Sequence, residues 1–170
     1  VKGSADFANL SASGTATFQT TGAFNAGAAL SAPGNITVLA NAGIAFTQAG
    51  ATAITGGGTN TVTLTASNGA ITSANANTDV SAGVLVASAN GGLSIDAAVS
   101  NVSLTNTNSG NITFTNTTGV NLDAISQPVG SLSVKAGGAI TQTGAISANA
   151  GTATFNAGTT NDITLANATN

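Results

Sequence analysis

Apolar and polar residues alternate in short runs along this chain, and small turn-forming residues bracket each run. Gly34-Asn35-Ile36-Thr37-Val38 and Gly110-Asn111-Ile112-Thr113-Phe114 are two copies of this pattern. Alternation with period two is typical of a β-strand that has one buried and one exposed face. Each run is too short to bury a core alone, so the repetition predicts that the copies stack on one another. The pattern recurs at 60–64, 92–95, 101–104, 130–134 and 162–165.

The distances between copies predict the length of one stacked turn. The step from Ile112 to Leu132 is the shortest of those considered, whereas the step from Ile36 to Val62 and the step from Val62 to Val84 are both longer. We interpret the longer steps as turns that carry loop insertions, such as the three glycines at 56–58.

A second repeat agrees with this length. Thr47-Gln48-Ala49-Gly50-Ala51 and Thr141-Gln142-Thr143-Gly144-Ala145 are nearly the same five residues, with a looser copy at 19–23. Five turns of about 19 residues would span the distance between the two close copies.

Two or three short strands in each turn of about 20 residues predict an all-β fold, a right-handed parallel β-helix (β-solenoid). We expect about eight rungs of about 19–21 residues, in a single segment spanning 1–170. A sandwich built from hairpins is the alternative, because Asn68-Gly69 and Asn90-Gly91 are dipeptides favoured in tight hairpins. Pro33 and Pro128 lie beside expected turns, where a missing N–H is tolerated.

The composition narrows the classes of partner. Charged residues make up only 4% of the chain and the net charge is -3, whereas about 25% is usual in soluble domains. With Lys2 and Lys135 as the two basic residues, we expect no binding to nucleic acid. A mean hydropathy of +0.31 and the regular β-branched residues favour a folded chain over a disordered one.

Other sequence features bear on the origin of the chain. Cysteine is absent, so neither disulfides nor thiol chemistry is expected. No apolar run approaches the ~18–20 residues of a transmembrane helix. Residues 1–4 do not read as a signal peptide, and 166–170 stop within the repeat pattern. We therefore expect a segment of a longer repetitive protein.

The candidate acid–base chemistry rests on aspartate, because His, Cys, Tyr, Trp, Met and Glu are all absent. A glycosidase site needs two carboxyl groups at ~5–9.5 Å, and many parallel β-helix proteins act on polysaccharides. The carboxylates are scattered singly, in contexts where Asp is an ordinary turn residue. We therefore predict no enzymatic activity and no catalytic residue. The five are Asp6, Asp79, Asp96, Asp123 and Asp162.

Other binding motifs are incomplete. Gly91-Gly92-Leu93-Ser94-Ile95-Asp96 resembles one calcium-binding nonapeptide, but Ser94 replaces its third glycine and the motif does not repeat. The glycines at 56–58 lack the Lys-Ser/Thr of a phosphate loop. We predict no metal site and no cofactor. The Asn-x-Ser/Thr triplets follow from the repeat itself, and we read them as incidental; they begin at Asn9, Asn35, Asn101, Asn111, Asn116 and Asn167.

Threonine pairs separated by one residue raise the possibility of an ice-binding face. Such a face needs threonines in register on one flat side of a solenoid. Here the pairs are expected to drift relative to the start of each rung, and threonine is also the default outward β-branched residue of a strand. The pairs begin at Thr15, Thr61, Thr63, Thr105, Thr113, Thr141 and Thr152.

The stretches 130–146 and 152–158 resemble the repeats of filamentous haemagglutinin-like exoproteins, which are exported by two-partner secretion. The likeness covers most of the chain and is clearest from about Ile36 to Leu165. The resemblance implies a right-handed parallel β-helix in a large secreted adhesin of a Gram-negative bacterium. The secretion module of that family is not recognisable in this segment.

We therefore expect a structural or adhesive shaft segment of an extracellular or cell-surface bacterial fibre. Its expected partners are further copies of itself, end to end or laterally, and glycans or host and abiotic surfaces. The alternatives are a β-helical polysaccharide-active enzyme, which would need converging aspartates, and an ice-binding solenoid, which would need in-register threonine columns.

Overall fold

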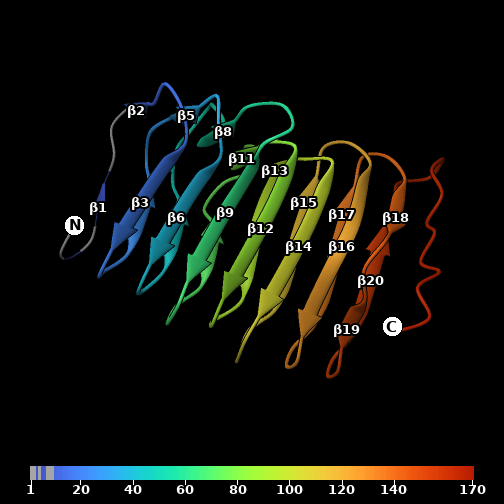
Figure 1. The fold of residues 1–170 in the computed structure, drawn as a ribbon. Helices are drawn as coiled ribbons and strands as arrows, with labels where there is room; N and C mark the ends of the chain where they lie inside the picture. Colours follow the sequence, from blue (N-terminus) through green and yellow to red (C-terminus); the bar gives the residue numbers. More distant parts are fainter. Residues whose placement is uncertain (1–2, 4, 7–9) are drawn as a thin grey trace.

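A computed structural model describes residues 3, 5–6 and 10–170 of the chain. Within these residues every strand pairing is parallel, and the strands wind into a right-handed β-solenoid (Figure 1). No helix in the described part is long and apolar enough to cross a membrane. Lys2, Asn9 and the side chain of Asp6 lie outside the described residues.

Sheet B forms one wall of the solenoid, and its strands define seven successive levels among the described residues. Figure 1 shows these strands side by side, from blue to red. Their order is β3 (Ala16–Thr20), β6 (Ile36–Ala40), β9 (Thr61–Ala66), β12 (Val84–Ala89), β14 (Asn101–Asn106), β16 (Val120–Gln127), and then β18 (Ile140–Gln142) with β19 (Ile146–Ala148).

Sheet A forms the opposite wall and changes design along the axis. Its early levels are divided into two short strands, whereas its later levels each contain one long strand. The first column is β1 (Ala5–Asp6), β4 (Phe24–Ala26), β7 (Ile44–Phe46) and β10 (Ile71–Ser73), and the second is β2 (Leu10–Ser11), β5 (Leu30–Ala32), β8 (Ile54–Gly56) and β11 (Val80–Ser81). The long strands are β13 (Leu93–Ala98), β15 (Ile112–Asn116), β17 (Leu132–Ala136) and β20 (Ala153–Asn156).

β13 is the junction between the two designs. Its first residue, Leu93, pairs with Ile71 of β10, while Ala97 pairs with Val80 of β11. Turns therefore contain three strands before this level and mostly two after it, with β18 and β19 giving the last turn a third, which agrees with the predicted two or three strands per turn.

The core lies between the two sheets as columns of inward-facing aliphatic and aromatic side chains. Stacked partners are ~4.8 Å apart, and each fully buried side chain contributes on the order of 1.5–3 kcal/mol. One column of sheet A is at most 3% exposed throughout and consists of Phe24, Ile44, Ile71, Leu93, Ile112 and Leu132.

The corners stack on one another as regularly as the strands. The N–H groups of Asn90 and Gly91 both donate to the Gly69 carbonyl of the preceding turn. Asn68-Gly69 and Asn90-Gly91 are therefore corners between parallel strands, and the hairpin alternative is wrong for the described residues.

Glycine is required at the corner that leads into the long strands of sheet A. Gly110, Gly130 and Gly151 have φ values of 85°, 96° and 94°. A Cβ at each would lie 2.3–2.6 Å from the carbonyl oxygen of the corner below. This explains why the repeat copies at 110 and 130 begin with glycine.

The spacing of the turns differs in part from the prediction. Ile36 pairs with Val62 and Ile112 with Leu132, as expected. Val62, however, pairs with Leu85 and not with Val84, so that turn is one position longer than predicted and Val84 points outward.

Turn length also varies more than predicted. On sheet B the shortest turn connects Val84 to its partner Asn101, and the longest connects Ile36 to Val62. The long turn was predicted as one that carries a loop insertion, whereas the turn from Val84 to Asn101 is shorter than the predicted length of about 19–21 residues, so that range is too narrow.

The two Thr-Gln copies are not equivalent positions, so the prediction of five turns between them is wrong. Thr47 and Gln48 follow β7 in sheet A, whereas Thr141 and Gln142 lie in β18 of sheet B. The mean turn nevertheless stays close to the predicted length, because five paired steps of sheet B connect Ile36 to Gln142.

The expected strand at 162–165 forms only a single bridge between Ile163 and Ile140. Ile163 is 43% exposed because no further level covers it in the described chain. Sheet B thus has seven levels of strand plus this bridge, where about eight rungs were predicted.

Candidate functional surfaces

The structure brings together two of the five aspartates. Asp79 lies just before β11 and Asp96 lies in β13, one level further along sheet A. One Asp79 carboxylate oxygen accepts a 2.8 Å hydrogen bond from the backbone N–H of Asp96. The aspartates are scattered singly along the sequence, and the stacking of neighbouring turns brings this pair together.

The position of Asp79 explains its contacts. β10 ends at Ser73 and β11 begins at Val80, so the middle of β13 faces a gap in the level below. The Asp79 carboxylate fills this gap, taking the Asp96 N–H on one oxygen and the Ser73 hydroxyl, at 3.1 Å, on the other. It therefore replaces the missing strand as a hydrogen-bond acceptor for β13.

Burial raises the pKa of Asp79 to about 6, since desolvation disfavours the charged carboxylate, and the neighbouring Asp96 adds a smaller effect in the same direction. The hydrogen bonds from Asp96 and Ser73 act in the opposite direction. The side chain is 2% exposed, so this carboxyl group is part of the wall and not of an open groove.

The remaining described aspartates lie elsewhere. Asp123 is the extra residue of a β-bulge in β16, where Val102 and Ser103 pair with Leu122 and Ala124. Its carboxylate accepts hydrogen bonds from the Asn121 amide at 2.6 Å and the Thr143 hydroxyl at 2.9 Å on the outer face. Asp162 is exposed near the C-terminal end.

The calcium-like stretch does not form a calcium turn, because residues 93–96 belong to the extended strand β13. Among the described residues there is no group of three or more His, Cys, Asp or Glu side chains that could hold a metal ion. The glycines at 57–58 form a tight corner, in which a Cβ on Gly57 would lie 2.3 Å from the Pro33 carbonyl oxygen.

The glycosylation triplets are not equally accessible. Asn35 and Asn111 are exposed, and their amide oxygens accept backbone N–H groups of the next turn. Asn116 is 1% exposed, so its side chain is unavailable for modification in the folded chain.

Three buried amide side chains were not anticipated from the sequence. Asn106, Asn116 and Gln127 are at most 1% exposed, and each lies at the last inward position of a long strand. The Asn116 amide oxygen accepts the Val99 N–H, while its nitrogen donates to the Val99 and Gly119 carbonyls. A usable signal was present, since in 102–106 the inward alternation Val, Leu, Asn continues into the amide.

The outer face of sheet B carries three columns of mostly polar side chains that are in register from level to level. Thr17, Thr37 and Thr63 pair directly, so the predicted drift of the threonines is wrong on this wall. The middle column is Thr17, Thr37, Thr63, Val86 and Ser103. The flanking column nearer the start of the strands is Thr61, Val84, Asn101, Asn121 and Thr141. The flanking column nearer their end is Gln19, Leu39, Thr65, Ser88, Thr105, Ser126 and Ser147.

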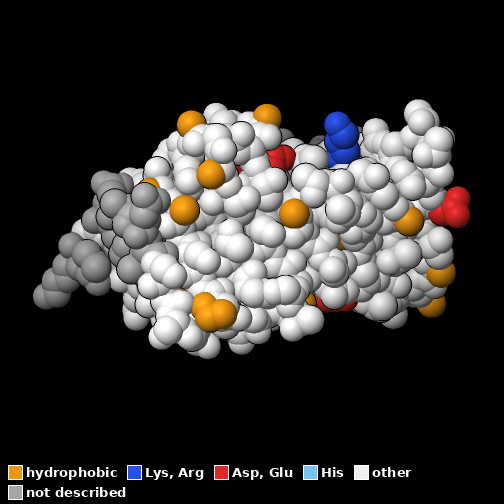
Figure 2. All heavy atoms as spheres, turned by 90° about the horizontal axis from the view of Figure 1, so that it is seen from above, with side chains coloured by type: hydrophobic (Ala, Val, Ile, Leu, Met, Phe, Trp, Pro, Cys, Tyr) orange, Lys and Arg blue, Asp and Glu red, His pale blue; other side chains and the backbone are white. Residues whose placement is uncertain are grey.

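A side of the molecule that adjoins this face is similarly poor in charge. Figure 2 shows an adjoining side on which polar and backbone atoms dominate, hydrophobic side chains form isolated spots, and charged groups are few.

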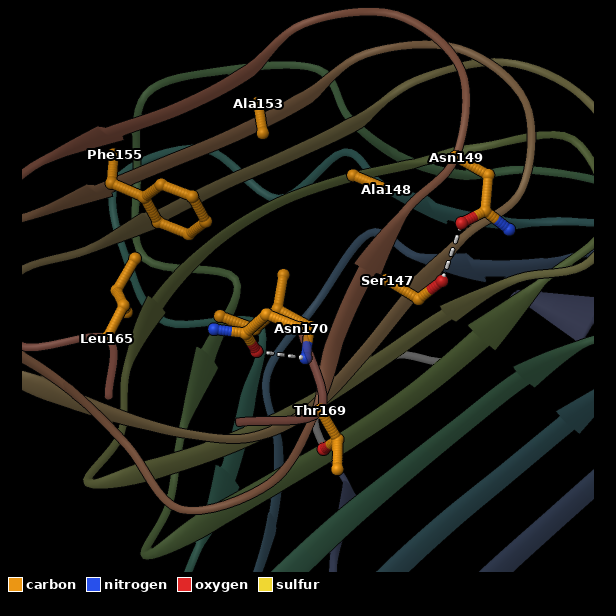
Figure 3. Close-up of a pocket in the computed structure, with 9 residues that line it drawn as sticks. Ser147, Ala148, Asn149, Ala153, Phe155, Leu165, Thr169 and Asn170 are labelled. Carbon is orange, nitrogen blue, oxygen red and sulfur yellow. Dashed lines mark hydrogen bonds between the residues drawn. The ribbon is translucent and has the colours of Figure 1, made fainter. Parts of the chain in front are cut away.

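The C-terminal end of the core contains a hollow of about 330 Å³ (Figure 3). Phe155 and Leu165 lie on one side of it, with Ala148 on another. Asn170 closes part of the rim by accepting the Ile146 N–H at 3.0 Å. The lining is largely apolar because the hollow is the last section of the core column.

The fold and these surfaces define a parallel β-solenoid repeat protein. Residues 109–170, just over a third of the chain, match the family model described as "Repeats of unknown function (DUF5649)". The matched part begins in the region of two-strand turns. No curated protein and no solved structure matches the chain.

Proposed function

We propose that this chain is a structural, adhesive shaft segment of a secreted or cell-surface fibre of a Gram-negative bacterium. One observation carries the proposal: apolar side chains face inward and mostly polar side chains face outward through the seven levels of sheet B. A stack of this kind extends along one axis at ~4.8 Å per level, so added turns lengthen it without changing its cross-section.

The outer faces support an adhesive role. Hydroxyl and amide groups repeat along each wall, and few charges are present to impose a strongly charged partner. Many weak polar contacts repeated along a rod can combine into retention on a glycan-coated surface.

The C-terminal end supports assembly along the axis. β20 pairs only with β17 among the described strands, and its free edge lies beside the apolar hollow. The free edge of a parallel sheet is a template for a further strand, so another turn would bury Ile163 and extend the hydrogen-bond ladder.

Two measurements test this function. Small-angle X-ray scattering should give a rod whose length corresponds to seven to eight levels, about 35–40 Å. Beads coated with the folded chain should be retained under flow on glycan-coated surfaces better than beads coated with heat-unfolded chain. Equal retention of the two preparations would contradict the adhesive role, and a compact particle in scattering would contradict the shaft.

A second candidate function is ice binding, which the in-register threonines of sheet B favour. Thermal hysteresis of the folded chain, compared with the triple variant Thr17→Lys, Thr37→Lys and Thr63→Lys, decides it. A wild-type chain without hysteresis removes this candidate.

A further inference from the structure

The middle of the sheet B face carries an exposed apolar side chain. Val86 is 37% exposed and belongs to β12, the fourth of seven levels. It also stands in the middle of the three outward columns, between Thr63 on one side and Ser103 on the other. Val84, two residues earlier in the same strand, points outward as well.

Apart from Val84, the nearest outward neighbours of Val86 are polar and uncharged. The three columns consist mostly of Thr, Ser and Asn, and among the described outward residues of sheet B the one carboxylate is Asp123, on the sixth level. No segment of the described chain crosses in front of β6 to β16 in Figure 1. The face therefore has an apolar centre and a polar rim, which is the arrangement of a protein interface.

We propose that this face binds the same face of a second copy of the chain, with a twofold axis that lies in the plane of the interface and passes through Val86. This inference rests on the proposed fibre function and specifies how two shafts would associate laterally. In a twofold interface a residue on the axis meets its own copy, so Val86 would pack against Val86.

The area of the face suits such a dimer. Seven levels span ~30 Å and the strands are ~18 Å long, so each copy would bury roughly 550 Å². The total of roughly 1,100 Å² is above the ~1,000 Å² expected of a specific interface, at its weak end.

The position of Asp123 selects the orientation. If the two solenoids ran parallel, the level that carries Asp123 would face its own copy and two carboxylates would repel each other. In the antiparallel arrangement level six faces level two, so these carboxylates are separated by about four levels, or ~19 Å.

Cysteine cross-linking tests the axis directly, because the chain has no cysteine of its own. Val86→Cys should form an intermolecular disulfide under mild oxidation, since residue 86 meets its copy. Thr37→Cys lies on the same column but off the axis, and its copies would be too far apart for the Cα separation of ~4.4–6.8 Å that a disulfide needs. Cross-linking of Thr37→Cys as efficient as that of Val86→Cys would overturn the proposal.

Sedimentation equilibrium tests the association itself. Val86→Lys places a charge at the centre of the interface and should weaken dimerisation at least ~10-fold. Thr113→Lys is the matched control, because Thr113 is exposed on the outer face of sheet A and receives the same charge. A wild-type chain that remains monomeric at its highest soluble concentration, or equal weakening by both variants, would refute the interface.

The shape of the particle in scattering distinguishes a failure of the proposed lateral interface from a failure of the proposed fibre function. A lateral dimer keeps the length of the monomeric rod, whereas an end-to-end dimer doubles it. A monomeric or end-to-end rod would overturn the lateral interface and leave the shaft intact. A chain that stays monomeric in solution but binds a glycan or an ice surface through this face would show that the face serves that ligand, and would overturn self-association.

Discussion

The first and second halves of the solenoid build the same wall by different means. Before β13, each level of sheet A is two short strands separated by a loop, and afterwards it is one long strand. The inward position at the end of the sheet B strands changes as well: Ala40, Ala66 and Ala89 occupy it at levels two to four, and Asn106 and Gln127 at levels five and six. The interior of a corner can thus be filled by a small apolar side chain or by a buried amide that forms hydrogen bonds with backbone N–H and carbonyl groups.

The largest expected loss of stability comes from removing a buried phenylalanine in either half, and it tests whether the two halves are equally well packed. Phe46 in the first half and Phe114 in the second are both at most 1% exposed. Phe46→Ala and Phe114→Ala should each lower the free energy of unfolding by about 3–5 kcal/mol, measured by urea denaturation.

Hydrogen exchange would locate each effect. Because each turn contacts only its neighbours, Phe46→Ala should speed exchange in β4 to β10, and Phe114→Ala in β13 to β17. Faster exchange along the whole rod in either variant would mean that the halves do not respond separately.

The next largest loss of stability comes from exchanging alanine and asparagine at the last inward position of the sheet B strands, and it tests whether the two residue types are interchangeable there. Asn106 accepts the Gly92 N–H and donates to the Ser109 and Gly110 carbonyls, so Asn106→Ala should cost about 2–3 kcal/mol in thermal or urea unfolding. The reverse change in the same column, Ala66→Asn, should also destabilise, by about 2 kcal/mol, because it buries an amide in a corner built for a methyl group.

The control for both corner variants is Thr105→Ala, which alters an outward side chain next to Asn106 and should change stability by less than ~0.5 kcal/mol. Corners that tolerate both exchanges would show that the difference between the halves has no energetic basis.

The junction between the halves should be sensitive to pH. Because the pKa of Asp79 is about 6 in the folded chain and 3.8 for an ordinary aspartate, the folded state binds the proton more tightly. The contribution of Asp79 to stability is therefore greatest below pH 3.8, falls as pH rises towards 6, and is constant above that. The total change is at most about 3 kcal/mol.

Asp79→Asn removes this titration while keeping an oxygen that can accept the Asp96 N–H. The variant should be at least as stable as the wild type at pH 7 and should lose the decrease between pH 3.8 and 6 in urea titrations. An unchanged pH profile would assign the dependence to another group.

The smallest expected effect lies at the exposed corners, where the halves are alike. The Asn68 amide donates to Asn41 in the first half, and the Asn108 amide donates to Asn90 in the second, both at the surface. Asn68→Ala and Asn108→Ala should each cost less than about 1 kcal/mol in urea unfolding, because water replaces an exposed partner. A large loss in one variant alone would extend the difference between the halves to the surface.

The strands and their parallel stacking could be predicted because inward and outward positions differ in polarity at most levels. The register at β12 could not, since Val84, Leu85 and Val86 are three consecutive apolar residues and the period of two fits either face. The structure places Leu85 inward, continuing the alternation to Ala87 and Ala89. The run that obscured the register is also the one that gives the outer face its apolar centre.

The role of Asp79 could not be predicted for a different reason. The sequence indicates a turn residue, which is correct locally, but the hydrogen bond that matters comes from a strand 17 residues further along. That contact depends on β10 ending early beneath a long strand, a property of two turns together. The hydrogen bonds of the buried amides similarly depend on backbone groups of a neighbouring turn, as Asn106 does on the Gly92 N–H.

Unequal turn lengths give this rod a mechanical signature. If the chain is pulled by its two ends, levels peel away one at a time, because each is held by its neighbours alone. The extension released at each event is the contour length of that turn. The turn from Val84 to Asn101 on sheet B should release ~60 Å, and the turn from Ile36 to Val62 ~90 Å. The order of these steps in a force–extension trace would therefore identify which end of the shaft unfolds first.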